Sequence, residues 1–383
     1  MKLPKRIPLM ALDNMAARHR DAVLAAMQRV LDGGWYILGQ EVEAFEREWA
    51  AYLGTASCIG VGNGTDAIAV ALRAVGVQSG DEVLTVSHTA VATVAAIEQI
   101  GAVPVLVDID PRSRCLDPAR VADLCTDRTR AMVPVHMYGQ PAPMPALLSI
   151  AKQYGLRVVE DCAQAHGAEI DGRKVGTFGD AAAFSFYPTK NLGAFGDAGA
   201  VVTGSAEVAT AARALRQYGW ATRYVSDRPG INSRLDELHA ACLRVLLPQL
   251  DADNRRRRDI AAAYHTAVRD CGVRVPARID GTTPVVHLYV VECAERERFE
   301  AHMSQRGIDT GRHYPMAVHE QPAYCGRLRG HDRLPNTERL YRELVTLPCH
   351  PGLTDEEVRC ICDALAEWNP SLSTGDATRR AAA

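Results

Sequence analysis

The sequence lacks several features that mark particular classes of protein. Aromatic residues make up only 6% of its 383 residues, whereas Ala and Gly are abundant, which favours helices packed on a sheet over a β-sandwich. No apolar stretch reaches the ~20 residues of a membrane span, and the N-terminal MKLPKRIPLM lacks the apolar core of a signal peptide. The formal net charge of -3 provides no basic field for nucleic acid or an anionic membrane. We therefore expect a soluble cytoplasmic protein that binds neither, and in which any phosphate recognition is local.

The cysteines are not spaced as metal ligands or redox pairs. Eleven are scattered along the chain, and none shows the C-x-x-C spacing of a zinc site or a dithiol. Only Cys360 and Cys362 lie close together, and this two-residue spacing within a helix puts them on different faces. We therefore expect reduced, buried thiols and no metal site.

Short apolar runs alternate with helical segments through the first half of the chain. This alternation predicts an α/β fold, with a mostly parallel sheet covered by helices on both faces. Ligands bind beyond the carboxyl ends of the strands in such sheets, so the residues that follow each strand are candidate site residues. The predicted strands are 58–61, 82–86, 103–107, 131–135 and 157–160, and the predicted helices include 18–31, 40–52, 67–74 and 90–99.

The composition changes in the second half of the chain. After Leu235 a helical pattern runs past Pro248 to Ala267, and shorter alternating and helical segments follow. Because 383 residues exceed the usual size of one domain, we predict a large domain at 1–250, a smaller α+β domain at 251–370 and a disordered tail at 371–383. The basic run 255–258 could bind phosphate, but a solvated helix face is the favoured interpretation.

The segment VGNGTDAIAVALRAVGV, residues 61–77, has the pattern of a phosphate site. A strand is followed by a turn and an apolar helix, so the N–H groups of Gly64, Thr65 and Asp66 would point at an anion at the positive end of the helix. The absence of a side chain at Gly64 would allow the backbone to come close to that anion. An ordinary turn with a helix N-cap fits the same residues equally well.

The segment VVEDCAQAHGA, residues 158–168, brings carboxylates to the end of a predicted strand. A carboxylate buried there is costly without a cationic partner, and a protonated pyridine nitrogen beside Asp161 would supply one. Gln164, three residues on, could then hydrogen-bond a ring hydroxyl. Magnesium binding or helix capping by Asp161 remains open.

The segment SFYPTKNLGAFGDAGAVV, residues 185–202, is the most specific. Lys190 lies between aromatic and Gly-rich stretches, and a lysine in such surroundings is a candidate for a lowered pKa and imine chemistry. Ser185, five residues earlier, has a hydroxyl suited to a phosphate oxygen. A phosphate turn, a strand-end Asp and a Lys in a Gly-rich loop, in this order, are hard to obtain by chance.

These three segments, together with residues 230–257 and RHYPMAVHEQPAY at 312–324, resemble the DegT/DnrJ/EryC1/StrS sugar aminotransferases. The resemblance spans residues 7–368 and implies a fold-type I, aspartate aminotransferase-like fold that binds pyridoxal 5'-phosphate (PLP). It also implies a homodimer whose active sites lie at the subunit interface. The implied cofactor contacts are Lys190 as the covalent attachment, Asp161 on the pyridine nitrogen, Gln164 near the ring oxygen, Gly64, Thr65 and Ser185 on the phosphate, and Asn232 from the other subunit.

One departure concerns the face of the cofactor ring. The family has an aromatic residue after the His-Thr pair, whereas this sequence has Ala90, so His88 or another side chain would have to cover the ring. His88, Tyr187, Tyr314 and His319 are the candidates for the sugar pocket. Tyr314 and His319 fit equally well as a packed tyrosine and a hydrogen-bonded core histidine.

The resemblance implies transfer of an amino group from L-glutamate to a nucleotide-linked keto-sugar. The stretch NLGAFGDAGAV after Lys190 is similar to that of members that act on dTDP-linked 3-keto-6-deoxyhexoses, whereas 4-keto enzymes more often read T-T-G-E-G-G there. A 4-aminotransferase, an inosose aminotransferase and a non-catalytic regulator remain alternatives. A 3-dehydratase of the same fold would have His in place of Lys190, and a Rossmann dehydrogenase would have a G-x-G-x-x-G after the first strand.

Overall fold

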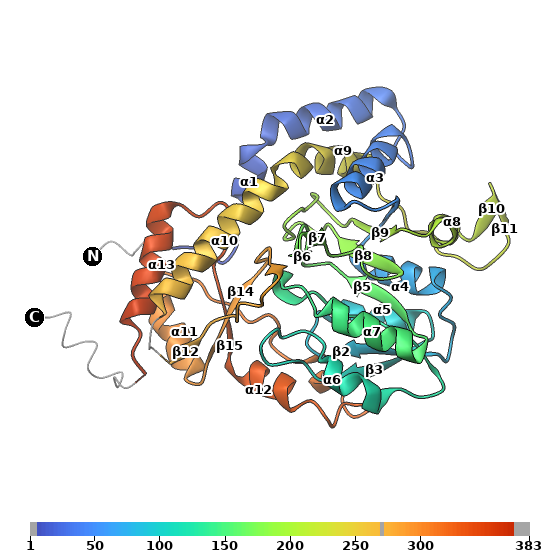
Figure 1. Ribbon diagram of the computed structural model, residues 1–383. Coiled ribbons are helices and arrows are strands. Elements are labelled where there is room, and N and C mark those ends of the chain that lie inside the picture. Colours follow the sequence, from blue (N-terminus) through green and yellow to red (C-terminus); the bar gives the residue numbers. More distant parts are fainter. Residues whose placement is uncertain (1–5, 269–271, 371–383) are drawn as a thin grey trace, which may run out of the picture.

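A seven-stranded sheet forms the centre of the computed structural model, which describes residues 6–268 and 272–370 (Figure 1). Its strand order is β1-β9-β8-β5-β4-β2-β3, and β9 is antiparallel to both of its neighbours, while β5, β4, β2 and β3 pair in parallel. The mostly parallel α/β architecture predicted from the sequence is therefore confirmed. The strands are β1 Ser57–Val61, β2 Glu82–Val86, β3 Val103–Val107, β4 Thr129–Met132, β5 Arg157–Asp161, β8 Ala181–Ser185 and β9 Gly199–Thr203.

Strand β4 differs from the prediction of 131–135 because of a proline. Pro134 has no N–H to donate, so the regular ladder ends at Met132. The chain nevertheless stays extended beyond it, since Pro134 accepts a hydrogen bond from the Asp161 N–H and Val135 forms an isolated bridge with Asp161. This extension places residues 136–140 beside the end of β5.

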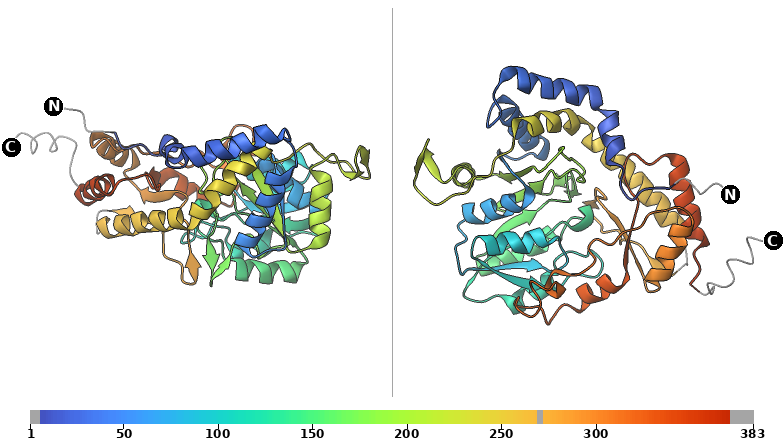
Figure 2. Two further views of the ribbon diagram at one scale, coloured as in Figure 1. Left: turned by 90° about the horizontal axis from the view of Figure 1, so that it is seen from above. Right: turned by 180° about the vertical axis from the view of Figure 1, so that it is seen from behind.

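Helices cover both faces of the sheet, as the views in Figures 1 and 2 show. One apolar cluster contains one face of the sheet with α4, α5 and α8, and a larger cluster contains the other face with α3 and α7. Both faces are buried, which is why the strands are continuously apolar. The helices of this unit are α1 Leu12–Arg18, α2 Arg20–Gly33, α3 Gln40–Leu53, α4 Gly64–Ala74, α5 Val91–Gln99, α6 Pro118–Val121, α7 Met144–Tyr154, α8 Ala206–Leu215 and α9 Glu237–Leu246, with 3-10 turns at Ala122–Leu124 and Met137–Gly139.

The helical run after Leu235 is not one helix. A 3-10 turn at Leu247–Gln249, which contains Pro248, separates α9 from α10, Leu250–Ala267. Proline cannot donate the backbone hydrogen bond of a helix interior, so the regular helix is interrupted there. The second segment, α10, then leads to a further group of elements (Figure 1).

That group has its own core. An antiparallel sheet, β12-β14-β15, packs with α10, α11 and α13 around buried residues that include Tyr264, Tyr289 and Phe299. Ile7, near the start of the chain, joins this core through a bridge to Ile308. The elements are β12 Val273–Arg274, β14 Tyr289–Cys293, β15 Leu344–Leu347, α11 Arg296–Gln305, α12 Pro335–Glu343 and α13 Asp355–Glu367, with a 3-10 turn at Val318–Glu320.

Two small sheets complete the architecture. A hairpin, β10 Trp220–Thr222 and β11 Val225–Ser226, projects from the body in all three ribbon views. The strands β6 Glu169–Ile170, β7 Arg173–Lys174 and β13 Thr282–Thr283 form the other sheet, which joins the two halves of the chain.

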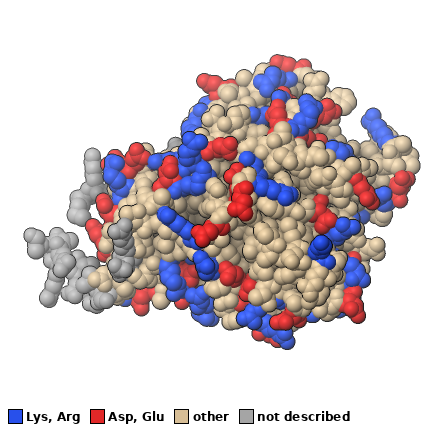
Figure 3. Space-filling model, viewed as in Figure 1, with Lys and Arg blue, Asp and Glu red and all other residues tan. Residues whose placement is uncertain are grey.

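Other expectations concern the chain as a whole. Nine cysteines among the described residues are free thiols, and five of these nine are buried. Within 6–268 and 272–370, no helix combines the length and apolar character that crossing a bilayer requires. Acidic and basic side chains are interspersed over the face drawn in Figure 3. The tail predicted to be disordered, 371–383, lies outside the described residues.

Candidate active site

The candidate site lies where the segments that follow β1, β2, β5 and β8 meet. Asp161 is the last residue of β5, and Lys190 lies in the loop between β8 and β9. Helices α4 and α5 begin just after β1 and β2. The parallel arrangement therefore brings the predicted residues to one edge of the sheet.

Asp161 is a buried carboxylate without an ion-pair partner among the described residues. Its Oδ2 accepts a hydrogen bond from Thr93 Oγ1 at 2.8 Å, and its Oδ1 accepts one from the Ala163 N–H at 3.1 Å. Burial raises the pKa of Asp161 above its usual value, although these two hydrogen bonds and the charge of Lys190 oppose the change. A cation placed beside this carboxylate would stabilise its charged form.

Lys190 lies in a tightly folded loop. Its N–H donates to the Tyr187 carbonyl at 2.9 Å, and at Gly193 a Cβ would come within 2.6 Å of the Pro188 carbonyl oxygen. Burial lowers the pKa of Lys190 to about 8, with Asp161 acting in the opposite direction. A substantial fraction of its amine is therefore neutral near physiological pH, as imine chemistry requires.

The turn before α4 forms a narrow seat against β8. A Cβ at Gly64 would lie 2.6 Å from Ser185 Cβ, so glycine permits this close approach. The prediction that the Asp66 N–H is free is wrong, because Asn63 caps the helix and its Oδ1 accepts from Asp66 N at 2.8 Å. Within the described ranges the N–H groups of Gly64 and Thr65 have no protein acceptor. These two N–H groups and the Ser185 hydroxyl are thus the available phosphate donors.

Gln164 is fixed by residues from two different parts of the chain. Its Oε1 accepts from the Tyr138 N–H at 2.8 Å, and its Nε2 donates to the Tyr314 hydroxyl at 3.0 Å. Burial raises the pKa of Tyr314 to about 12, so its phenol is neutral at physiological pH. The second proton on Gln164 Nε2 remains available to a ligand oxygen.

Sequence and structure comparisons show which proteins share this arrangement. Residues 18–366 match the DegT/DnrJ/EryC1/StrS aminotransferase family. The chain belongs to this family. The aminotransferase is 45% identical over 364 residues to dTDP-3-amino-3,4,6-trideoxy-alpha-D-glucose transaminase of Streptomyces venezuelae, covering 95% of this chain and 96% of the relative. It is also 45% identical over 362 residues to dTDP-3-amino-3,6-dideoxy-alpha-D-galactopyranose transaminase of Aneurinibacillus thermoaerophilus, covering 94% and 99% of the two chains.

The same relationship appears in three dimensions. The crystal structure of S. venezuelae DesV in complex with a ketimine intermediate superimposes on this aminotransferase with a TM-score of 0.93 at 44% identity. The match covers 96% of this chain and 100% of the DesV chain. The fold-type I prediction is therefore confirmed.

His88 is enclosed in the aminotransferase. Its side chain has no exposed surface, and its ring packs edge-on against the rings of Tyr138 and Tyr341 at centroid distances of 5.2 and 5.3 Å. Burial lowers its pKa to about 3, so the ring is neutral. In this conformation His88 offers no surface to a cofactor ring or a sugar, whereas Ala90, at the N-cap of α5, is partly exposed.

His319 and Tyr187, which were also predicted to contact the sugar, have surroundings different from those of His88. The hydroxyl of Ser87 accepts from the His319 N–H at 3.1 Å and lies 2.7 Å from His319 Nδ1, so His319 is a hydrogen-bonded histidine that joins its loop to the end of β2. Tyr187 is half exposed, with 49% of its surface accessible, in the same loop as Lys190. The ring of Tyr187 is thus open to a ligand.

Asn232 does not cap a helix. Helix α9 begins at Glu237 with Asp236 as its N-cap, so Asn232 lies four residues before that cap. Asn232 is exposed, while the neighbouring Ser233 donates to Asp66 Oδ2 at 2.6 Å and accepts from the Gly62 N–H at 2.9 Å. Its assignment to the other subunit's phosphate site stays a prediction.

Sequence reasoning missed several residues that hold the site together. Thr93 bonds Asp161 directly, and its position in the first turn of α5, after a strand, was the available signal. Asn191 follows Lys190 and donates to Asn254 Oδ1 at 2.8 Å, while its own Oδ1 accepts from His287 Nδ1 at 3.0 Å. No local pattern connects these last three residues, because they meet only in the folded chain.

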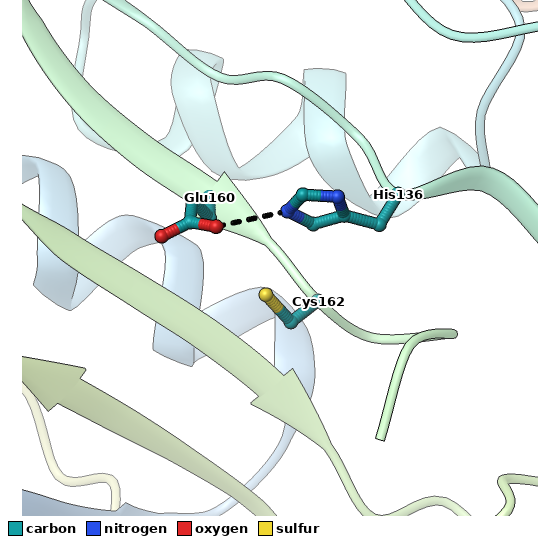
Figure 4. Close-up of side chains that lie close together, drawn as sticks. All are labelled: His136, Glu160 and Cys162. Atoms are coloured by element: carbon teal, nitrogen blue, oxygen red, sulfur yellow. Dashed lines mark hydrogen bonds and ion pairs between the residues drawn. The ribbon is translucent and has the colours of Figure 1, made fainter. Parts of the chain in front are cut away.

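His136, Glu160 and Cys162 form a buried polar cluster (Figure 4), and the last two flank Asp161 in the sequence. The side chains of His136, Glu160 and Cys162 have donor atoms within 4.8 Å of one another, as a metal site would require. However, His136 Nδ1 accepts from the Ala142 N–H at 2.9 Å, so its proton is on Nε2 and is donated to Glu160 at 3.0 Å. Three backbone N–H groups of the segment 176–179 donate to the two oxygens of Glu160. Four hydrogen bonds therefore satisfy the Glu160 carboxylate, so its burial does not require a metal ion.

Proposed function

We propose that this aminotransferase uses PLP to transfer an amino group from L-glutamate to C3 of a dTDP-linked 3-keto-6-deoxyhexose. The observation that carries the proposal is that two groups influence each other's charge in one site: a partly buried lysine, whose pKa is about 8, and a buried carboxylate, whose pKa is raised and which forms no ion pair with any described residue. A lysine on the surface would keep its ordinary pKa, and an aspartate exposed to water would need no cationic partner. Strongly perturbed groups of this kind concentrate at catalytic sites.

The side chains around this pair fit the cofactor. The N–H groups of Gly64 and Thr65 and the hydroxyl of Ser185 would hold the phosphate. Gly64 lies so close to Ser185 that a side chain at position 64 would not fit between them. Asp161 would hold the proton of the pyridine nitrogen, which is the cationic partner that its burial calls for. PLP, when bound, accepts the amino group from the donor and withdraws electrons from the carbon that loses a proton.

The chain's own groups would then perform the proton transfers. The Lys190 amine is suited to take a proton from the donor's α-carbon and return it, because its pKa of about 8 lies near the working pH. Thr93 and the Ala163 N–H fix the orientation of the Asp161 carboxylate. The contacts of Gln164 with Tyr138 and Tyr314 hold its amide in a single orientation toward the ring hydroxyl.

The position of amination is supported by two observations. Both relatives described above are named as transaminases of dTDP-3-amino sugars. The stretch Asn191–Val201, NLGAFGDAGAV, is also of the kind that favours 3-keto substrates. The retention of both Lys190 and Asp161, in surroundings that lower the pKa of the lysine and raise that of the carboxylate, favours a catalyst over a non-catalytic regulator.

We further propose that the active unit is a homodimer. Trp35 and Tyr224 are 66% and 72% exposed, which is unusual for aromatic side chains on a free surface. They lie in the segments 34–38 and 217–224, which line a common hollow of about 850 Å³ near the projecting hairpin. A second copy that covers these segments would bury the exposed aromatics and bring its own Asn232 close to the interface.

Incubation of the purified protein with glutamate and individual nucleotide keto-sugars, with products identified by mass, tests the reaction. A 3-keto substrate should gain an amino group, and Lys190→Ala should abolish the conversion. Turnover of only 4-keto substrates would contradict the position, and an unchanged rate for Lys190→Ala would remove Lys190 from the mechanism.

Subunit complementation tests the shared site. Lys190→Ala and Asn232→Ala subunits, each weak alone, should regain part of the activity after exchange, because one site in a mixed dimer has both residues intact. Activity no greater than the sum of the two variants, in subunits shown to have exchanged, would refute the contribution of Asn232 across the interface.

A further inference from the structure

One further cavity is lined by residues other than the candidate catalytic and phosphate-binding groups. It has a volume of about 520 Å³ and is formed by residues of the segments 112–114, 137–140, 258–265 and 276–289. Neither Lys190 nor Asp161 nor Ser185 lines it. Its walls come from both halves of the chain, and junctions of this kind are a common location for small-molecule sites of this volume.

The inner wall of the cavity is apolar and already formed. Met137, Val286, Leu288 and Tyr289 line it, and all except Val286 are buried. The ring of Tyr289 is held in place by an edge-on contact with Tyr264 at a centroid distance of 5.2 Å. A flat apolar group could therefore enter without rearranging the core.

The rim of the cavity is basic. The side chains of Arg112, Arg258 and Arg278 have no hydrogen bond or ion pair anywhere in the described part of the chain, and Asp280 is the one acidic residue among those that line the cavity. Arg114, which also lines the cavity, is different, because it is buried in an ion pair of 2.9 Å with Glu292. The three rim arginines thus retain their full capacity to bind a carboxylate or phosphate.

The four arginines of the run 255–258 on α10 have different contacts. Arg256 pairs with Asp355 at 2.7 Å, and the buried Arg257 donates to backbone carbonyls, among them that of Cys349 at 2.6 Å. Arg255 is exposed on the helix surface, whereas Arg258 is half-buried and faces the cavity. The prediction of a solvated face therefore fits Arg255 but not the whole run.

We propose that this cavity binds a small organic anion that has a flat apolar body and a carboxylate or phosphate head. The apolar body lies against Leu288 and Tyr289, and the head lies between Arg258 and Arg278. The occupant also contacts Tyr138, whose backbone N–H holds Gln164 in the active site. Binding at this site does not depend on the reaction proposed above.

Calorimetric titration of the holoenzyme with 2-naphthoate tests the ligand chemistry, and the uncharged 2-naphthamide serves as the matched probe. We expect one naphthoate per chain, bound about tenfold or more tightly than the amide because its charge is matched by the arginines. No measurable binding at millimolar naphthoate, or equal affinity for the two probes, would overturn the proposal.

Variants locate the bound probe. Arg258→Ala should weaken naphthoate binding about tenfold or more, and the matched Arg255→Ala, on the same helix but outside the cavity, should leave it within about twofold. Ala262→Trp should block the cavity from its exposed edge. Lys190→Ala should bind naphthoate as the wild type does, even if the enzyme turns over none of the keto-sugars. If Lys190→Ala lost naphthoate binding and Arg258→Ala kept it, the probe would be bound in the active site, and this result would overturn the inference.

Discussion

The reactivity of Lys190 toward aldehydes should depend on pH in a way that other lysines do not share. Its pKa is about 8, against 10.5 for an ordinary lysine. At pH 7.5 about a quarter of its amine would be neutral, compared with about 0.1% for a lysine at the ordinary value, so the concentration of nucleophile is about two hundredfold higher. Replacing Asp161 by Asn removes the charge that favours the protonated form, and the pKa of Lys190 should then fall below 8.

Trapping experiments on cofactor-free protein would measure this difference. The protein is treated with pyridoxal phosphate across pH 6–10, reduced with borohydride, and the labelled lysines are quantified by peptide mass. Labelling of Lys190 should rise with a midpoint near 8, whereas labelling of the lysine in a short unstructured peptide, with the ordinary lysine pKa, should still be rising at the alkaline end of the range.

The comparison between the two lysines decides the result. Parallel labelling of Lys190 and the peptide lysine would show that burial does not perturb Lys190, and the argument from its environment would fail. An unchanged midpoint in Asp161→Asn would separately refute the electrostatic coupling of Asp161 to the lysine. Lys190→Arg, which keeps a positive charge but cannot form the imine, controls for labelling elsewhere.

Three further substitutions test the surroundings of the site. Gly64→Ala should weaken cofactor binding about tenfold in a spectroscopic titration, because its Cβ would lie 2.6 Å from a neighbouring Cβ and overpacking costs about 1–3 kcal/mol. The control Gly33→Ala adds a Cβ with nothing within 4 Å and should bind the cofactor normally. Equal cofactor affinities of the two variants would refute the steric argument. Glu160→Gln should lower the free energy of unfolding by about 2–3 kcal/mol at pH 7. Since the pKa of Glu160 is lowered in the fold, this difference in stability between wild type and variant should shrink as the pH falls below the ordinary pKa of glutamate and the wild-type carboxylate is protonated. A stability difference that does not change with pH would argue against a charged Glu160. Tyr314→Phe should reduce kcat/KM about fivefold by freeing the amide of Gln164, with unfolding nearly unchanged, whereas wild-type kinetics would remove the hydroxyl from the site.

The parts of the fold that sequence predicted correctly are those decided locally. The runs Glu82–Val86 and Val103–Val107 are apolar, rich in β-branched residues and bounded by turns, so both strands have the predicted limits. Helix α2 ends at Gly33, two residues after the predicted end at Leu31, because Gly34 adopts the left-handed conformation that terminates helices. In these places the local preference and the tertiary structure agree.

The errors in the fold arise where a proline or a capping bond competes with the pattern. Apolar periodicity continues through Pro134 and Pro248, but the missing N–H group ends the regular element in each case. Asp66 has the right position to donate to a phosphate, yet its N–H is used by the Asn63 side chain. A rule that gave capping precedence over the helix dipole would have found this bond.

The candidate site was predictable only in part because its residues depend on different ranges of interaction. The placement of Asp161 and Lys190 could be predicted, since a strand end and a Gly-rich loop are local signals. The enclosure of His88 depends on Tyr138 and Tyr341, which are 50 or more residues away in the sequence. Sequence patterns carry no information about which distant ring will occupy a given face.

The neighbours Glu160 and Asp161 show why buried charge alone does not identify a catalytic group. Both carboxylates are buried at the end of one strand, and their side chains point to opposite faces because they are consecutive. Glu160 pays for its burial with four hydrogen bonds, from His136 and three backbone N–H groups, which hold its pKa below the usual value despite desolvation. Asp161 has only two, from Thr93 and Ala163, and its pKa is raised. The carboxylate whose surroundings leave its charge incompletely compensated is the one with capacity left for a cationic ligand. This difference arises from the folded surroundings and not from residue type, and it is the reason why we propose a catalytic role for Asp161 and a stabilising role for Glu160.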